Sequence, residues 1–314
     1  MKTIISETLD TVAAMEKYDA ACKMLLSQKV ILAWILKHCL EEFRNYSADK
    51  IVQDFIEGDP QIDAVDVMPV IRGMNPENTE VKEGRITGDI RFCTKTPQGN
   101  RWIVDVEAQR RFHPQYSLTK RGAYYLGRMI SAQRGTEFTD SHYEKLKKTF
   151  VIWICLEPPK AWNNVVTGYD VSEYSILGEG TLPPEEYELM SQIIIGLGDP
   201  EAESATGVLR LLDVMFSENL DVEKKKQIML SEFGISMTKE LEEGVSKMCN
   251  FSEAILERGM KRGMEQGIVR GEGRLNALNE KLIEDGRVDD LFRAIKDEMF
   301  RQGLYVEYGM IITN

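Results

Sequence analysis

Residues 85–109 read RITGDIRFCTKTPQGNRWIVDVEAQ, and this stretch decides the fold. Apolar and polar residues alternate from Arg85 to Phe92, which is the period of a β-strand. A proline and a glycine lie between Thr96 and Asn100, where they predict a tight turn. Arg101 to Gln109 is rich in Trp, Ile and Val, which favour strands. The stretch therefore predicts an antiparallel β-hairpin.

Further elements follow the hairpin. Phe150 to Leu156 is apolar throughout, so it is predicted to be a central strand that is covered on both faces. The pattern of residues from Tyr116 to Arg134 predicts a helix, which lies between the hairpin and this strand in the sequence. Shorter extended segments are predicted near Val165 to Leu177 and Tyr187 to Leu197. This mixture of strands and helices indicates an α/β fold.

The N-terminal part is predicted to be mainly helical. From Tyr18 to Glu57 apolar residues recur every three or four positions, and Ser47 can cap a second helical segment. Residues 1–16 are predicted to be a loose leader. Gly58 to Gly84 contains several prolines and is predicted to be a loop, with at most a short extended piece from Val67 to Arg72.

After Pro200 the pattern becomes helical. Helices are predicted at Leu209–Phe216, Val222–Phe233 and Thr238–Glu257, and a long charged helical pattern runs from Leu275 to Phe300. We therefore expect two parts, which are residues 1–198 and an all-helical C-terminal extension, residues 199–314.

Glycine recurs every four residues in the extension, at Gly259, Gly263, Gly267 and Gly271. On a helix from 259 to 273 these glycines form a stripe that can let a second backbone approach closely. A helix pair in a homodimer explains the spacing. A weak, frayed helix also explains it, because each glycine costs about 1 kcal/mol relative to alanine.

Composition narrows the classes of function. No apolar run reaches the roughly 18 residues that a membrane span needs, and the first residues lack a signal-peptide layout, so we expect a cytoplasmic protein without membrane partners. The five cysteines lie far apart without a Cys-x-x-Cys motif, which argues against disulfides and zinc. A metal would need carboxylate ligands, and these favour a hard ion such as Mg²⁺.

Basic residues gather in one window of an acidic chain. The net charge is −12, yet residues 95–150 contain 11 lysines and arginines against 5 acids, so this window carries +6. Proteins that bind phosphates need local rather than overall positive charge. The window is compatible with nucleic-acid binding and equally with an ordinary solvated helix.

The predicted hairpin brings acids together. Asp105, Glu107 and Gln109 project from one face of a strand, because alternate residues share a face. Asp89 on the preceding strand can face them. Two converging carboxylates repel each other unless a cation lies between them, and a divalent metal there can activate water and polarise a phosphodiester. Asp105 either supports this site or faces solvent.

The predicted helix after the hairpin presents basic and aromatic residues at helical spacing. Lys120, Tyr124 and Arg128 lie four residues apart, as do Arg121 and Tyr125. We expect this helix to hold phosphates, with Arg121 and Tyr125 directed at the acids.

Several segments resemble the PD-(D/E)XK nuclease family transposases, also called recombination-promoting (Rpn-type) nucleases. The segments are Gly88–Phe92, Glu107–Gln109 (18 residues after Asp89), Lys120–Leu126, Leu40–Phe43, Val151–Cys155 and the glycine repeat Arg258–Gly273. The resemblance implies a restriction-endonuclease-like core, with a mixed central sheet flanked by helices, that cleaves DNA with Mg²⁺ or Mn²⁺.

The resemblance also implies roles for single residues. Asp89 and Glu107 would bind the metal, with Glu42, or less readily Glu41, as an accessory acid. Gln109 stands where the superfamily usually has lysine, and glutamine can orient a water but not carry charge. Gly88 replaces the motif's proline. DNA contacts would come from Lys120, Arg121, Tyr125 and Arg128.

Two hypotheses follow from the sequence. The first is a metal-dependent DNA endonuclease that acts in recombination or transposition. The second is a weakly active or inactive nuclease-fold protein that binds DNA through the basic helix or a protein partner through the glycine repeat.

Overall fold

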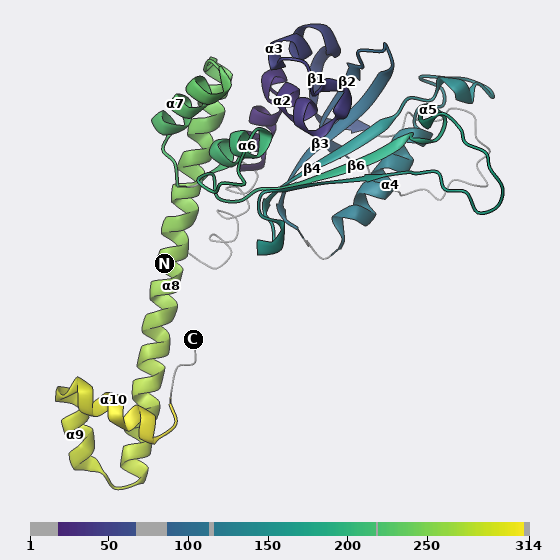
Figure 1. The fold of residues 1–314 in the computed structure, drawn as a ribbon. Helices are drawn as coiled ribbons and strands as arrows, with labels where there is room; N and C mark the ends of the chain where they lie inside the picture. Colours follow the sequence, from purple (N-terminus) through teal and green to yellow (C-terminus); the bar gives the residue numbers. More distant parts are fainter. Residues whose placement is uncertain (1–17, 67–86, 113–115, 218, 311–314) are drawn as a thin grey trace. The chain divides into compact units, whose positions relative to one another are not determined.

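The computed structural model describes residues 18–66, 87–112, 116–217 and 219–310 (Figure 1). Within these ranges the side chains of residues 62–66, 87–89, 111, 250–270 and 272 are not described. The chain divides into two compact units, Met1–Phe251 and Ser252–Asn314. The predicted leader and the extended piece at Val67–Arg72 lie outside the described residues, as does His113.

The first unit is built on a six-stranded mixed sheet with the order β1-β2-β3-β4-β6-β5. Strands β1 (Ile56–Asp66), β2 (Thr87–Lys95) and β3 (Arg101–Arg111) are antiparallel neighbours. Strands β3, β4 (Thr149–Glu157) and β6 (Met190–Gly196) run parallel, and β5 (Val165–Asp170) lies antiparallel on the outer edge of β6. The predicted hairpin, central strand and α/β class are confirmed. The extended segment predicted at Val165–Leu177 ends as a strand at Asp170.

The turn of the β2–β3 hairpin is fixed by its own hydrogen bonds. The Thr96 amide donates to the Asn100 carbonyl at 2.7 Å, and the Gly99 amide donates to the Thr96 carbonyl at 2.8 Å. Gly99 has φ +93°, a backbone conformation that side chains other than hydrogen disfavour. The turn therefore fixes the register in which Arg91 lies opposite Asp105.

Helices cover both faces of the sheet. One face carries residues such as Val104 and Phe150 and packs against α2 (Lys29–Cys39) and α6 (Val208–Phe216) in the main core. The other face carries residues such as Val151 and Trp153 and packs against α4 (Leu118–Ser131). Figure 1 shows α4 on the opposite side of the sheet from α2. The polar residues of β3 project toward α4.

The helical prediction for Tyr18 to Glu57 is wrong at its end, because Ile56 and Glu57 belong to β1. Residues 18–26 are helical, and α2 is followed by the short η1 (Glu41–Phe43), α3 (Ala48–Lys50) and η2 (Ile51–Phe55). Ser47 caps α3 as predicted, accepting from the Lys50 amide at 3.3 Å. The chain then enters β1, because Ile56 pairs with Thr94 and the Thr94 hydroxyl donates to the Phe55 carbonyl at 3.0 Å.

Helices α6 and α7 (Val222–Phe233) begin and end largely where the sequence predicts. Helix α8 (Lys239–Glu284) begins as predicted, but the predicted end at Glu257 is wrong, because the helix continues to Glu284. Asp221 caps α7 by accepting from the Lys224 amide at 2.8 Å, and Gly234 ends it with φ +66°. Residues of all three helices lie in the same core cluster as α2. The prediction that residues 1–198 and residues 199–314 form separate domains stays a prediction.

The second unit contains the end of α8, α9 (Val288–Lys296) and α10 (Glu298–Glu307), which enclose a small core. The pattern predicted from Leu275 to Phe300 is therefore broken into three helices. Gly286, with φ +69°, lies in the turn after α8. The glycine repeat lies within α8, and its role in pairing stays a prediction. Within the described ranges, no helix combines the length and the apolar character that crossing a membrane requires.

Candidate active site

Asp105 projects from the β3 face beneath α4, and it is fully buried, with 0% of its surface exposed. Arg91 from β2 donates to both carboxylate oxygens, at 2.6 Å from Nε and 2.5 Å from Nη2. Burial raises the pKa of Asp105, and the Arg91 guanidinium opposes this shift. The alternative in which Asp105 faces solvent is wrong, because the residue forms a buried ion pair that joins two strands.

Glu107 lies one step further along the same face and is 3% exposed. Its Oε2 is 3.3 Å from Nη2 of Arg121, which projects from α4. In the parallel ladder Glu107 lies beside Trp153 of β4, and the Arg121 guanidinium stands over the Trp153 ring at 5.1 Å from the centroid. A buried carboxylate thus meets a cation that is held against an aromatic ring.

Arg121 joins the polar residues of this cluster. Its Nε donates to the Tyr125 hydroxyl at 2.9 Å, and its Nη1 donates to the Tyr116 hydroxyl at 3.1 Å and to Gln109 Oε1 at 3.4 Å. Burial lowers the pKa of Arg121, but Glu107 and the Tyr125 hydroxyl outweigh it and raise the pKa above its usual value. Arg121 is therefore a permanent cation over Glu107 and Gln109.

The position of α4 depends on a close approach to β6. Gly122 faces Gln192, and a Cβ atom at this position would lie 2.4 Å from the Gln192 side-chain Cδ. Gln192 Nε2 in turn donates to the Leu118 carbonyl at 3.2 Å. Apolar residues of α4, among them Tyr125 and Met129, bury their side chains on the same face. Glycine at this point therefore leaves room for the buried Gln192 side chain against α4.

The structure separates Glu42 from Glu107. Glu42 lies in η1 and lines a hollow together with Trp102, near the hairpin turn. Trp102 belongs to the core cluster on the other face of the sheet, and it lies five residues before Glu107 along β3, which is about 16 Å of strand. Glu42, and Glu41 beside it in η1, are therefore not placed to share a ligand with Glu107.

Asp89 lies in β2, two residues before Arg91. The β2–β3 register extends to the pair Ile90 and Val106. Because the Asp89 side chain is not described, its predicted approach to Glu107 stays a prediction.

The four residues expected to contact DNA divide between two sides of α4. Arg121 and Tyr125 belong to the cluster over the sheet. Lys120 is exposed, and Arg128 stands over the half-exposed Tyr124 ring at 5.9 Å from the centroid. The helix therefore presents basic residues to solvent as well as to the site.

Sequence reasoning missed four residues that shape the cluster, which are Arg91, Tyr116, Trp153 and Gln192. Arg91 was accessible from the sequence, because a five-residue turn from Thr96 to Asn100 sets it opposite Asp105. Trp153 belongs to the strand that was predicted to be covered on both faces, and it is buried, yet its ring also supports Arg121. Nothing in the sequence singled out Gln192 as the contact of α4.

The donor set partly fits a hard divalent cation. Glu107 supplies carboxylate oxygens and Gln109 an amide oxygen, and both types suit Mg²⁺. Among the side chains that the structure describes, no group of three or more His, Cys, Asp or Glu could hold a metal ion. A metal site here therefore depends on Asp89.

Comparisons of the chain with protein-family models, with curated proteins and with solved structures found no match.

Proposed function

We propose that this protein is a DNA endonuclease of the PD-(D/E)XK type that depends on Mg²⁺ or Mn²⁺ and acts in recombination or transposition. The observation that supports the proposal is the convergence of Glu107, Gln109 and Arg121 on one buried face of the sheet. The mixed sheet flanked by helices is the coarse architecture that the resemblance implies. A buried acid beneath a fixed guanidinium is an arrangement suited to phosphate chemistry.

Asp89 and Glu107 would hold the cation. Continuing the β2–β3 register by one residue pair beyond Ile90 and Val106 sets Asp89 opposite Glu107 along the ladder. The cation would supply Lewis-acid polarisation of the scissile phosphate. Gln109 lies two residues after Glu107 on the same face of β3, and it would orient the attacking water through its amide oxygen.

Arg121 would bind a phosphate oxygen of the DNA. The guanidinium has five donors, and it already contacts Tyr116, Tyr125, Gln109 and Glu107. Its distance of 3.3 Å from Glu107 is longer than a close ion pair, so exchanging this contact for a phosphate costs little. When a phosphate replaces Glu107 as the partner of Arg121, Glu107 would be released to bind the cation. Lys120 and Arg128 would hold flanking phosphates.

Plasmid nicking combined with metal titration tests the proposal. Wild-type protein should nick supercoiled DNA in Mg²⁺ or Mn²⁺ but not in EDTA. Glu107→Gln should abolish both nicking and Mg²⁺ binding measured by calorimetry, while Glu144→Gln, on the exposed η4 (Tyr143–Lys145), should change neither. Metal-dependent nicking that survives Glu107→Gln would refute the assignment.

One observation favours the second candidate, a nuclease-fold protein that binds DNA without cutting it. The Arg121 cation already neutralises Glu107, so this acid does not need a metal. For that function, DNA binding should persist in EDTA and in Glu107→Gln, and fall in Arg121→Ala. The glycine repeat would then contact a second copy of the chain or another protein. In that case sedimentation should show a larger assembly for the full chain than for a chain that ends before Ser252.

A further inference from the structure

Two half-exposed aromatic rings lie among the basic residues of α4. Tyr116, just before the helix, is 48% exposed, and Tyr124 on the helix is 46% exposed. The Arg121 guanidinium stands over the Tyr116 ring at 5.8 Å from its centroid, and the Arg128 guanidinium stands over the Tyr124 ring at 5.9 Å. Rings that a cation already holds can stack on a further flat group at little cost in conformational entropy.

Helix α4 also has the charge that a nucleic acid requires. Its 14 residues include Lys120, Arg121 and Arg128 and no aspartate or glutamate. Lys120, Tyr124 and Arg128 follow one another at four-residue steps, which are about 6 Å each along the helix axis. A cation, a ring and a second cation therefore alternate along one side of α4. A nucleic-acid strand alternates phosphates and flat bases, so it complements this stripe in both charge and shape.

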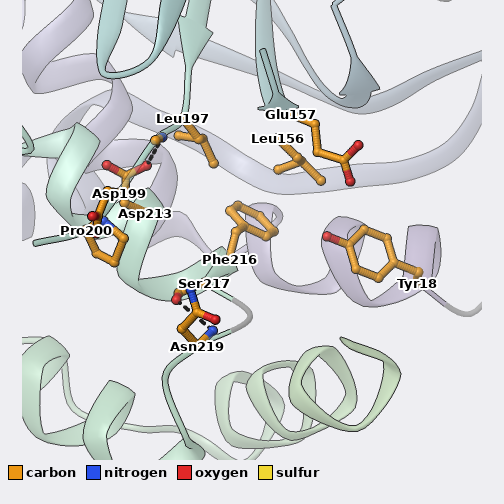
Figure 2. Close-up of a pocket in the computed structure, with 11 residues that line it drawn as sticks. Tyr18, Leu156, Glu157, Leu197, Asp199, Pro200, Asp213, Phe216, Ser217 and Asn219 are labelled. Atoms are coloured by element: carbon orange, nitrogen blue, oxygen red, sulfur yellow. Dashed lines mark hydrogen bonds between the residues drawn. The ribbon is translucent and has the colours of Figure 1, made fainter. Parts of the chain in front are cut away.

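The hollow at the carboxyl ends of β4 and β6 does not suit a phosphate chain. It encloses about 410 Å³, and its charged lining residues within the described ranges are the acids Glu157, Asp199 and Asp213. Figure 2 shows Asp213, whose Oδ1 accepts from the Gly198 amide at 2.8 Å, while its Oδ2 accepts no hydrogen bond from any residue that the structure describes. Because these acids repel phosphates, a nucleic acid is expected at α4 and not at this hollow.

The burial of the candidate acid favours a flexible strand over a duplex. The Glu107 side chain is only 4% exposed, beneath an Arg121 side chain that is 26% exposed. A duplex is stiff over about 150 base pairs, and its stacked bases do not offer their faces to a tyrosine ring. A single strand bends freely and exposes its bases. One of its phosphates can therefore approach the recessed acid while neighbouring bases stack on Tyr116 and Tyr124.

We propose that α4 binds single-stranded DNA, with unpaired bases stacked on Tyr116 and Tyr124. Lys120 and Arg128 would pair with the phosphates on either side of the base at Tyr124, and Arg121 with the phosphate to be cleaved. Single-stranded DNA would then be the substrate of the nuclease site proposed above, and this assignment of a substrate rests on that proposal. Negative supercoiling favours local unpairing, so a supercoiled plasmid would also offer such a strand.

Fluorescence anisotropy of the full-length protein in EDTA tests the proposal, because it measures binding without cleavage and the α4 stripe needs no metal. The probes are a labelled DNA single strand of about 16 nucleotides, the same strand annealed to its complement, and an RNA of the same sequence. The DNA single strand should bind at least about tenfold more tightly than the duplex. Equal or tighter binding of the duplex would overturn the proposal, and so would tighter binding of the RNA.

Variants at Tyr124 separate stacking from hydrogen bonding by the hydroxyl. Tyr124→Phe keeps the ring and should keep the affinity for the single strand, whereas Tyr124→Leu should lower it by about tenfold and leave duplex binding unchanged. Tyr174→Leu is the matched control, because this tyrosine is 77% exposed in the loop after β5, beside Glu173, and its loss should change neither affinity. Equal losses in Tyr124→Phe and Tyr124→Leu would overturn the stacking role.

Failure of this proposal can be told apart from failure of the nuclease proposal. If the single strand binds preferentially and Tyr124→Leu removes the preference, but the wild type nicks no plasmid in Mg²⁺, the single-stranded DNA site stands and the nuclease assignment falls. If nicking depends on Mg²⁺ and Glu107 but the duplex binds as tightly as the single strand, the single-stranded DNA site falls and the nuclease assignment stands.

Discussion

Replacing Arg91 with methionine should strongly destabilise the first unit. Arg91 and Asp105 form a bidentate ion pair at 2.6 and 2.5 Å, and their side chains are only 14% and 1% exposed. Removing one partner of a buried pair leaves the other charge uncompensated and typically costs about 3–5 kcal/mol. Because Arg91 keeps some contact with solvent, we expect the lower end, about 3 kcal/mol at pH 7.5.

Urea unfolding followed by tryptophan fluorescence measures this change. Trp34, Trp102, Trp153 and Trp162 are the four tryptophans, and all belong to the first unit, so the signal reports that unit. With a denaturant slope of about 3 kcal/mol/M, the midpoint should fall by about 1 M. A fall of less than about 0.2 M at an unchanged slope would refute the view that Asp105 relies on Arg91.

Acid pH and a double variant sharpen the result. In Arg91→Met the carboxylate of Asp105 lacks its cation, so burial holds its folded pKa above the unfolded value. The cost is therefore present at neutral pH and shrinks as pH falls through that folded pKa and Asp105 takes up a proton. The double variant Arg91→Met with Asp105→Leu should recover most of the loss, because it buries no charge. If the double variant were as unstable as the single one, the loss would come from the packing of the replaced side chains and not from an uncompensated charge.

Three further predictions follow. Gly122→Ala should lower the stability of the first unit by about 1 kcal/mol, because the added Cβ displaces the buried Gln192 side chain and breaks its hydrogen bond to the Leu118 carbonyl. Urea unfolding measures this change. Arg121→Lys should bind DNA more weakly than wild type, because lysine cannot replace the guanidinium fork; equal affinity by fluorescence anisotropy would contradict this. Asp213→Asn should raise stability at pH 8 by about 1–2 kcal/mol and not at pH 4. Burial raises the folded pKa of Asp213 to about 6, so the wild type loses stability as pH rises from the unfolded pKa to that value; thermal melts at the two pH values check this.

The hairpin could be predicted from sequence because its signal is local. Alternation in β2 and the Pro-Gly turn fix strand, turn and register within one short stretch, and even the Arg91–Asp105 pair follows from them. Strand β1 could not be predicted in this way. Its sequence contains Gly58 and Pro60, it makes irregular pairs with β2, and Gly58 has φ +60°. The strand forms because β2 offers it an edge, which is a tertiary effect.

The candidate site also contains residues whose position could be predicted from local sequence and residues whose position could not. The spacing of Arg121 and Tyr125 indicated that both face the sheet, because residues four apart share a helix face. The position of Glu42 could not be judged from spacing, since it depends on which face of the sheet the N-terminal helices cover. The carboxylate of Asp213 was not singled out either, because burial and the loss of one hydrogen-bond partner arise only when α6 packs against the end of β6.

The central claim is that Glu107 serves a metal-dependent nuclease site. The most direct test is the rate at which excess protein nicks supercoiled plasmid in Mg²⁺, compared between the wild type and Glu107→Gln. The wild-type rate should be at least about 100-fold above that of the variant, and neither protein should nick the plasmid in EDTA. Equal rates for the two proteins in Mg²⁺, or no nicking by the wild type, would contradict it.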